Sequence, residues 1–185
     1  PRIEHEFGID SMGETAENIA AQYEIKREAQ DGFAVESHRR AIAAQDSGRF
    51  DDEIVAVKIT PMKGETIYVK EDERPRRDSS LELLGRLNPS FRQGGTVTAG
   101  NSSGLNDGAS VLILASAERA NALGLKPMAR LVSCATAGIE PRLMGLGPIE
   151  AVRKALRKAR LEIEDIHLAE INEAFAASVL AVMHS

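Results

Sequence analysis

The pattern of apolar and polar positions changes near residue 94 of this chain. Before it, apolar residues recur at helical spacing in narrow stripes, and continuous apolar runs are scarce. From Gly95 onward, short unbroken apolar runs alternate with helical segments. We therefore expect an α-rich part that covers a site, followed by an α/β unit that holds the main core.

Helix signals in the first part are specific. Ser11 and Glu14 have the spacing of a capping box, and they precede a helix over TAENIAAQY. A longer helix is expected from about Arg27 to Gln45, where Ser47-Gly48 ends it. A short helix should open at SSLE, over residues 79–82, and stop before Pro89.

Two β-branched runs stand between these helices. EIVAVKI (53–59) and TIYVK (66–70) are separated by a segment that contains Pro61 and Gly64. That combination predicts a two-stranded excursion from the α-rich part.

The second part predicts an α/β fold. Four apolar runs are expected to be strands of a sheet that is covered on both faces, because three of them carry helical segments after them. The expected strands are GTVTAG (95–100), ASVLILAS (109–116), ARLVSCATAG (129–138) and IHLAEI (166–171). The expected helices are 118–123, 150–160 and 173–183.

Composition narrows the class of protein. Hydrophobic residues make up 43% and charged residues 28% of the 185 residues, as in soluble globular proteins. The net charge of -5 argues against a protein that grips nucleic acid or an anionic membrane, since both need a dominant basic face. No run approaches the ~20 apolar residues of a membrane span, and the first residues lack the order of a signal peptide. The chain starts without methionine, so we expect a processed or partial polypeptide.

Cysteine and histidine offer little chemistry. Cys134 is the single cysteine, so no intrachain disulfide or cysteine-based zinc site forms, which fits a cytoplasmic protein. It lies mid-strand among apolar residues, and packing is its expected role. The histidines have no metal-ligand spacing, so we expect no metal site and no catalytic role for His5, His38, His167 and His184.

Three segments carry polar groups that either bind a ligand or only stabilise the fold. Asn172 follows the expected strand 166–171, where it is either a helix N-cap or an amide that holds a water or an oxyanion. The segment 100–104 either lets a ligand approach the backbone or forms a tight turn, and it matches no nucleotide-binding glycine motif. The arginines of 74–77 either bind phosphate or form a solvated face.

Taken in order, these segments resemble the thiolase family. The resemblance rests on MGETAENIA, REAQDGFAVESHRRA, DERPRRDSSLE, GGTVTAGNSSGLNDGAS, ATAGIEPRLMGLGP and INEAFAA, and it covers essentially the whole chain. It implies a partial layered α-β-α-β-α core with an α-rich loop domain. It also implies acyl transfer between 3-oxoacyl-CoA and coenzyme A, with coenzyme A as a substrate and no tightly bound cofactor. A decarboxylating condensing enzyme on a related fold is disfavoured by INEAFAA and by the loop domain.

The resemblance also implies which parts of a thiolase the chain holds. Residues 1–93 would be the loop domain that covers the substrate, 94–126 the end of the amino-terminal core domain, and 127–185 the first half of the carboxy-terminal core domain. The acyl-accepting cysteine, the histidine of GHP and the second catalytic cysteine of the family are missing from this sequence. We therefore expect an inactive chain, or alternatively a coenzyme A-binding module. Its expected partners are acyl-CoA and the remaining thiolase segments, in an intact homodimer or homotetramer without nucleic acid or membrane.

Carried over by position, the resemblance gives roles around the acyl group. Asn172 would orient a catalytic water and line an oxyanion site. Ala174 and Phe175 would line the pocket beside it, and Met144 would line the acyl pocket. Met12 would lean over the substrate from the loop domain.

The same comparison gives roles along coenzyme A. Arg76 would approach the adenine and phosphate end, and Phe91 would pack on the pantetheine. Ala99, Ser103 and Gly104 would contact the pantetheine arm.

At two positions the sequence departs from some relatives. Ser11 replaces a histidine beside Met12, and Leu83 stands where a serine reaches the cofactor, so a polar contact is lost there. ATAGIEPRLMGLGP leans slightly toward thiolases of degradation pathways, including those that cleave 3-oxoadipyl-CoA.

Overall fold

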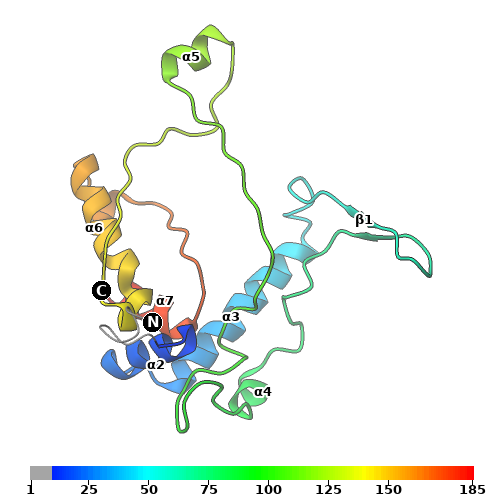
Figure 1. The fold of residues 1–185 in the computed structure, drawn as a ribbon, viewed down its shortest axis with the longest axis vertical. Helices are drawn as coiled ribbons and strands as arrows, with labels where there is room; N and C mark the ends of the chain where they lie inside the picture. Colours follow the sequence, from blue (N-terminus) through cyan, green and yellow to red (C-terminus); the bar gives the residue numbers. More distant parts are fainter. Residues whose placement is uncertain (1–9) are drawn as a thin grey trace.

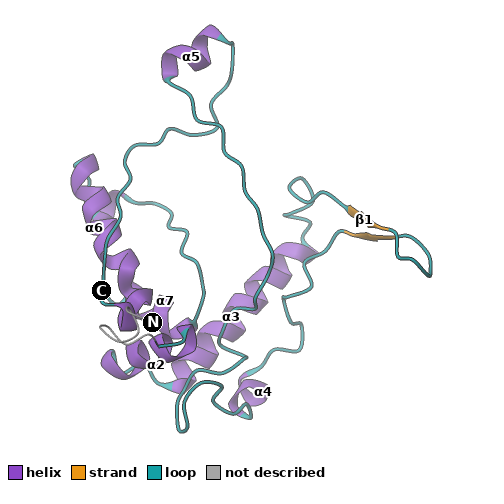
Figure 2. Cartoon of the chain, viewed as in Figure 1, coloured by secondary structure: helices purple, strands orange, loops and turns teal. Residues whose placement is uncertain are grey.

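The computed structural model describes residues 10–185, and His5 lies outside this range. Helices gather at one end, a hairpin projects to one side, and two long extended arms lead to an isolated helix at the far end (Figures 1 and 2). The elements are α2 (Met12–Gln22), α3 (Arg27–Asp46), β1 (Val57–Ile59), β2 (Ile67–Val69), α4 (Leu81–Gly85), α5 (Ala117–Ala122), η1 (Pro141–Leu146), α6 (Gly147–Ala159), η2 (Ile163–Asp165) and α7 (Ala176–Met183).

Serine side chains start three of the helices. Ser11 Oγ accepts a hydrogen bond from the Glu14 amide at 3.3 Å, which confirms the predicted start of α2. Ser80 and Ser116 cap α4 and α5 in the same way. Each cap satisfies an amide that has no partner within the helix. The sequence predicted the starts at Ser11 and Ser80, whereas it placed Ser116 in a strand and began the helix at Glu118.

The predicted end of α3 is confirmed, whereas the predicted start of α7 is wrong. α3 ends at Asp46, and the residues after it are Ser47 and Gly48, the latter with φ of 70°, as the sequence predicted. α7 begins at Ala176, later than predicted, and Phe175 occupies its N-cap position. The interpretation of Asn172 as an N-cap is therefore wrong.

The predicted two-stranded excursion is confirmed. β1 and β2 pair antiparallel with Val57 opposite Val69 and Ile59 opposite Ile67. The hairpin projects away from the helices (Figure 2), and its side chains are exposed apart from the partly buried Val69. The hairpin therefore adds little to the core.

The four strands predicted for the second part do not form within residues 10–185. The segments 95–100, 109–116, 129–138 and 166–171 have no ladder partners, and Val111 to Leu114 are 78–92% exposed. A β-strand is completed by hydrogen bonds to a neighbouring strand, and no segment of the described chain occupies that position. Cys134, predicted to be packed, is exposed for the same reason.

The core lies where α2, η1 and α7 meet. Ile19 of α2 is fully buried, with Ile25, Leu146 and Ala181 around it. η1 approaches closely because Gly145 has no side chain: a Cβ there would lie 2.6 Å from Ser178 Oγ. None of the helices in the described chain is long and apolar enough to cross a membrane.

Candidate functional site

Residues 98–104, which we call the junction loop, join the start of α7. The Ser103 amide donates to the Ala174 carbonyl at 2.9 Å, and the Ala176 amide donates to the Asn101 carbonyl at 3.0 Å. Ser102 and Phe175 form an antiparallel bridge between them. The structure thus brings together Ser103, Ala174 and Phe175, which are distant in the sequence.

An aromatic pair extends this junction toward α2. The rings of Phe91 and Phe175 meet edge to face, with centroids 6.1 Å apart and planes at 84°. The Phe91 ring lies directly against Gly13, in space that any Cβ at position 13 would occupy. Met12 precedes this glycine and is 53% exposed.

Arg74 lies against Gly104 at the end of the junction loop and bonds to the two residues that follow it. Its Nε donates to Asn106 Oδ1 at 2.8 Å, and its Nη2 donates to the Leu105 carbonyl at 3.0 Å. A Cβ at Gly104 would lie 3.0 Å from Arg74 Nη1, so the glycine allows this approach. The sequence pattern named Arg74 only as one of the arginines of 74–77, and the resemblance gave a role to Arg76 alone.

Carboxylates pair with the other two arginines of this segment. The hydrogen bond and charge of Arg76 lower the pKa of Asp78, and those of Arg77 lower the pKa of Asp46. Arg74 bonds to neutral oxygens and has no carboxylate partner among the described residues. Its positive charge is therefore the one left uncompensated beside the loop.

The Arg76 segment is also fixed to α3. The Arg76 amide donates to His38 Nδ1 at 3.2 Å. The Arg76 side chain itself is 70% exposed. A phosphate that reached it would have to compete with Asp78.

The remaining predicted site residues are exposed, and one of them, Ala99, is part of the junction loop itself. Asn172 and Ala99 are exposed, and Asn172 makes no hydrogen bond to the rest of residues 10–185. The next residue, Glu173, accepts from Ser37 Oγ of α3 at 2.6 Å. Met144 of η1 is 47% exposed, and Leu83 is 43% exposed.

Buried acids support the junction loop, and sequence reasoning missed them. Glu17 and Asp31 are each 3% exposed. Glu17 Oε1 accepts from the Thr96 and Val97 amides, both at 2.8 Å, which fixes the chain just before the loop. An acid in an amphipathic helix normally indicates the solvent face, so no sequence signal pointed to them.

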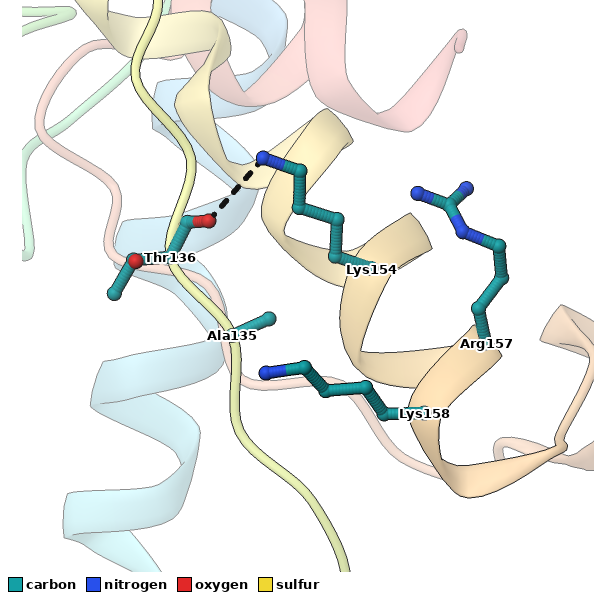
Figure 3. A pocket seen from close by; sticks show the side chains of 5 residues that line it. All are labelled: Ala135, Thr136, Lys154, Arg157 and Lys158. Atoms are coloured by element: carbon teal, nitrogen blue, oxygen red, sulfur yellow. Dashed lines mark hydrogen bonds between the residues drawn. The ribbon is translucent and has the colours of Figure 1, made fainter.

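A hollow of about 390 Å³ lies elsewhere, between α6 and the extended segment 133–136 (Figure 3). Lys158 Nζ donates to the Cys134 carbonyl at 2.9 Å, and Lys154 Nζ donates to the Thr136 carbonyl at 3.4 Å. None of the predicted site residues lines it. The described residues also contain no cluster of histidine, cysteine, aspartate or glutamate that could hold a metal ion.

Comparison with known proteins gives consistent matches. The family model described as "Thiolase, N-terminal domain" matches residues 3–118, and that described as "Thiolase, C-terminal domain" matches residues 125–185. The chain is 50% identical over 183 residues to the 3-oxoadipyl-CoA/3-oxo-5,6-dehydrosuberyl-CoA thiolase of Escherichia coli, covering 99% of this chain and 46% of that protein. It is 51% identical to an acetyl-CoA acetyltransferase of Pseudomonas aeruginosa, covering 95% of this chain and 45% of that protein.

Solved structures agree with these matches. The acetyl-CoA acetyltransferase of Bacillus anthracis superposes with a TM-score of 0.89 at 51% identity, over 94% of this chain and 44% of that one. Human mitochondrial 3-ketoacyl-CoA thiolase gives 0.87 at 42% identity, also over 94% and 44%. The superpositions confirm the predicted fold class, a partial thiolase-like α/β core with an α-rich loop domain. The chain spans less than half the length of the curated relatives it matches.

Proposed function

The chain belongs to the thiolase family, and from this premise we propose that it forms the coenzyme A-covering lid and one wall of an acyl-transfer site. The whole protein transfers an acyl group between 3-oxoacyl-CoA and coenzyme A. The observation that carries the proposal is the junction of residues 98–104 with the start of α7. It assembles Ser103, Ala174 and Phe175 from segments that the chain would otherwise keep apart.

Each part of coenzyme A meets a suitable surface. The edge-to-face rings of Phe91 and Phe175 offer an apolar contact for the pantetheine arm. Arg74, whose charge is uncompensated, attracts a phosphate, while Arg76 does so only after releasing Asp78. The exposed amide of Asn172 holds the water or oxyanion at the acyl end. Met12 and Met144 line the acyl side.

The chain by itself binds without turnover. Acyl transfer of this kind needs a cysteine that takes the acyl group, and the single cysteine, Cys134, lies beside α6 and away from the junction loop. The partners that complete the site are the remaining thiolase segments, in a homodimer or homotetramer. The exposed apolar segment 111–114 is a surface for them. The domains extend over 1–93, 94–126 and 127–185, and the protein is cytoplasmic.

Two measurements on the 185-residue chain test this function. Calorimetric titration with coenzyme A should give saturable binding, and acetoacetyl-CoA thiolysis should be undetectable. Arg74→Met should weaken binding about tenfold, as expected for a charge-assisted phosphate contact. Arg49→Met, which changes an exposed arginine after α3, should leave binding unchanged.

Two results would contradict the proposal. One is the absence of coenzyme A binding under conditions in which the helices are folded. The other is thioester cleavage that disappears when Cys134 is alkylated. The substrate is a 3-oxoacyl-CoA, and the two relatives at 50% and 51% identity, which differ in the acyl group of their names, do not favour one acyl chain.

A further inference from the structure

A single buried side chain connects the junction loop to the rest of the site. Asn101 is 3% exposed. Its Oδ1 accepts from the Thr98 amide at 2.8 Å, and its Nδ2 donates to Asp31 Oδ1 at 2.9 Å and to the Thr96 carbonyl at 3.1 Å. Its main-chain carbonyl accepts from Ala176. One residue therefore fixes the shape of the loop, its attachment to α3 and its contact with α7.

Asp31 continues the network to α4. Its Oδ2 accepts from Arg27 Nε at 2.7 Å. The Nη2 atom of Arg27 donates to the carbonyls of Leu84, at 2.6 Å, and Leu87, at 3.0 Å. A carboxylate this deeply buried is stable only because both oxygens have donors, one of them charged. The chain of bonds therefore runs from α4 through α3 and the junction loop to α7.

This network determines where the ligand-contacting groups lie. The Ser103–Ala174 hydrogen bond follows directly from the Asn101–Ala176 bond, because the two are adjacent rungs of the same short antiparallel contact. A slip of one residue at Asn101 would turn Ser103 to the opposite face of the contact with the start of α7. We propose that Asn101 and Asp31 are positioning residues for coenzyme A binding, which set the register between the junction loop and α7. The inference relies on the proposed function only for the identity of the ligand.

The chemistry explains why these two residue types stand at these positions. Asn101 uses both amide hydrogens and its oxygen, so alanine loses three bonds at once. Asp31 accepts from two donors on two separate oxygens. An asparagine has one acceptor oxygen, so Asp31→Asn keeps the shape but leaves either Arg27 or Asn101 without an acceptor.

The test compares Asn101→Ala, Asp31→Asn and the double variant with the unchanged chain. Asn121→Ala in α5 and Asp107→Asn are matched controls at exposed positions. Hydrogen exchange at the Ser103 and Ala176 amides reports the register between the junction loop and α7. Calorimetric titration measures the affinity for coenzyme A. We expect each network variant to speed exchange at both amides and to weaken binding, each about tenfold. The controls should change neither, and exchange in α6 should stay constant.

The double variant shows whether Asp31 affects binding by positioning Asn101 or independently of it. If Asp31 acts through Asn101, then Asp31→Asn should weaken binding by about twofold or less once Asn101 is alanine. If the two effects were independent, the double variant would weaken coenzyme A binding about a hundredfold, and that result would overturn the proposal. So would unchanged exchange at Ser103 and Ala176.

Two further outcomes also decide the question. If Asn101→Ala speeds exchange throughout α2 and α6, that variant has unfolded. The milder Asp31→Asn then tests the proposal, through its effect on exchange at the Ser103 and Ala176 amides. If the unchanged chain binds no coenzyme A, the proposed function fails, but the exchange measurement still supports or overturns the positioning role.

Discussion

Gly145 provides a sharp test of how the core is assembled. It lies in η1, next to Met144, where η1 packs against α2 and α7. A Cβ at position 145 would lie 2.6 Å from Ser178 Oγ, 2.9 Å from Ile19 Cδ1 and 3.0 Å from Ser178 Cβ. Ile19 is fully buried and Ser178 is 8% exposed, so neither side chain can move into solvent. Gly145→Ala must therefore shift η1.

Two opposing terms set the size of the effect. Overpacking a buried site typically costs about 1–3 kcal/mol. Replacing glycine in helical backbone gains about 0.5–1 kcal/mol from the lower entropy of the unfolded chain. Because two helices are contacted at once, we expect a net loss of about 1–2 kcal/mol. At an m-value of about 2 kcal/mol/M, the urea midpoint should fall by about 0.5–1 M.

The assay is urea unfolding followed by circular dichroism, with two companion variants. Gly147→Ala, at the first residue of α6, is the matched control, since its Cβ would meet nothing within 4 Å and its backbone is helical. It should be neutral or slightly stabilising. Ser178→Ala in the Gly145→Ala background should recover part of the loss, because it removes the nearest atom. If Gly145→Ala were as stable as Gly147→Ala, the close approach of η1 would be refuted.

Three other substitutions test the buried and charged groups. Glu17→Gln should lower the free energy of unfolding by about 1–3 kcal/mol in the same urea assay, because the amide nitrogen that replaces Oε2 in this buried site cannot accept from the Thr96 amide and hydroxyl. Ile19→Ala should cost about 2–5 kcal/mol and leave α5 unaffected by hydrogen exchange. Hydrogen bonds from Arg39 and Arg40 lower the pKa of Glu36 from its ordinary value of 4.5 to about 2. The ionised Glu36 carboxylate therefore stabilises the fold fully at pH values above 4.5, and this stabilisation is lost as the pH falls toward 2. Glu36→Gln should therefore lower Tm near pH 7, and the difference should vanish near pH 2; a difference that persists there would contradict this.

The helices were readable from the sequence because their signals are local. The Ser11 cap and the Gly48 stop each involve residues within a few positions of one another, and both were predicted correctly. The hairpin was readable for the same reason, since its two strands are near neighbours in the chain. Asn172 was misjudged as a possible cap because the pairing of Phe175 with Ser102, a non-local contact, delays the start of α7.

The contact between the junction loop and α7 was predictable from the sequence only in part. The resemblance pointed to Ser103, Ala174 and Phe175, which the structure brings together. It did not point to Asp31 or Glu17, whose role depends on burial. Burial of an acid is decided by partners far away in the sequence, such as Asn101 and Thr96, so periodicity alone places it on the wrong face.

The extended segments show why a correct fold class can coexist with missing strands. Superposition over 94% of the chain at a TM-score of 0.89 means that these segments follow the course of the chain in a related enzyme. Contacts of α6 hold one of them: Ser133 Oγ donates to the Ala155 carbonyl at 2.7 Å, and Lys158 donates to the Cys134 carbonyl. The side chains of a covering helix can thus fix where an extended segment runs, but only a neighbouring strand can satisfy the repeated amides and carbonyls along its edge. Contacts with a covering helix therefore determine the path of an extended segment, whereas the hydrogen-bond ladder of a sheet also requires a neighbouring strand.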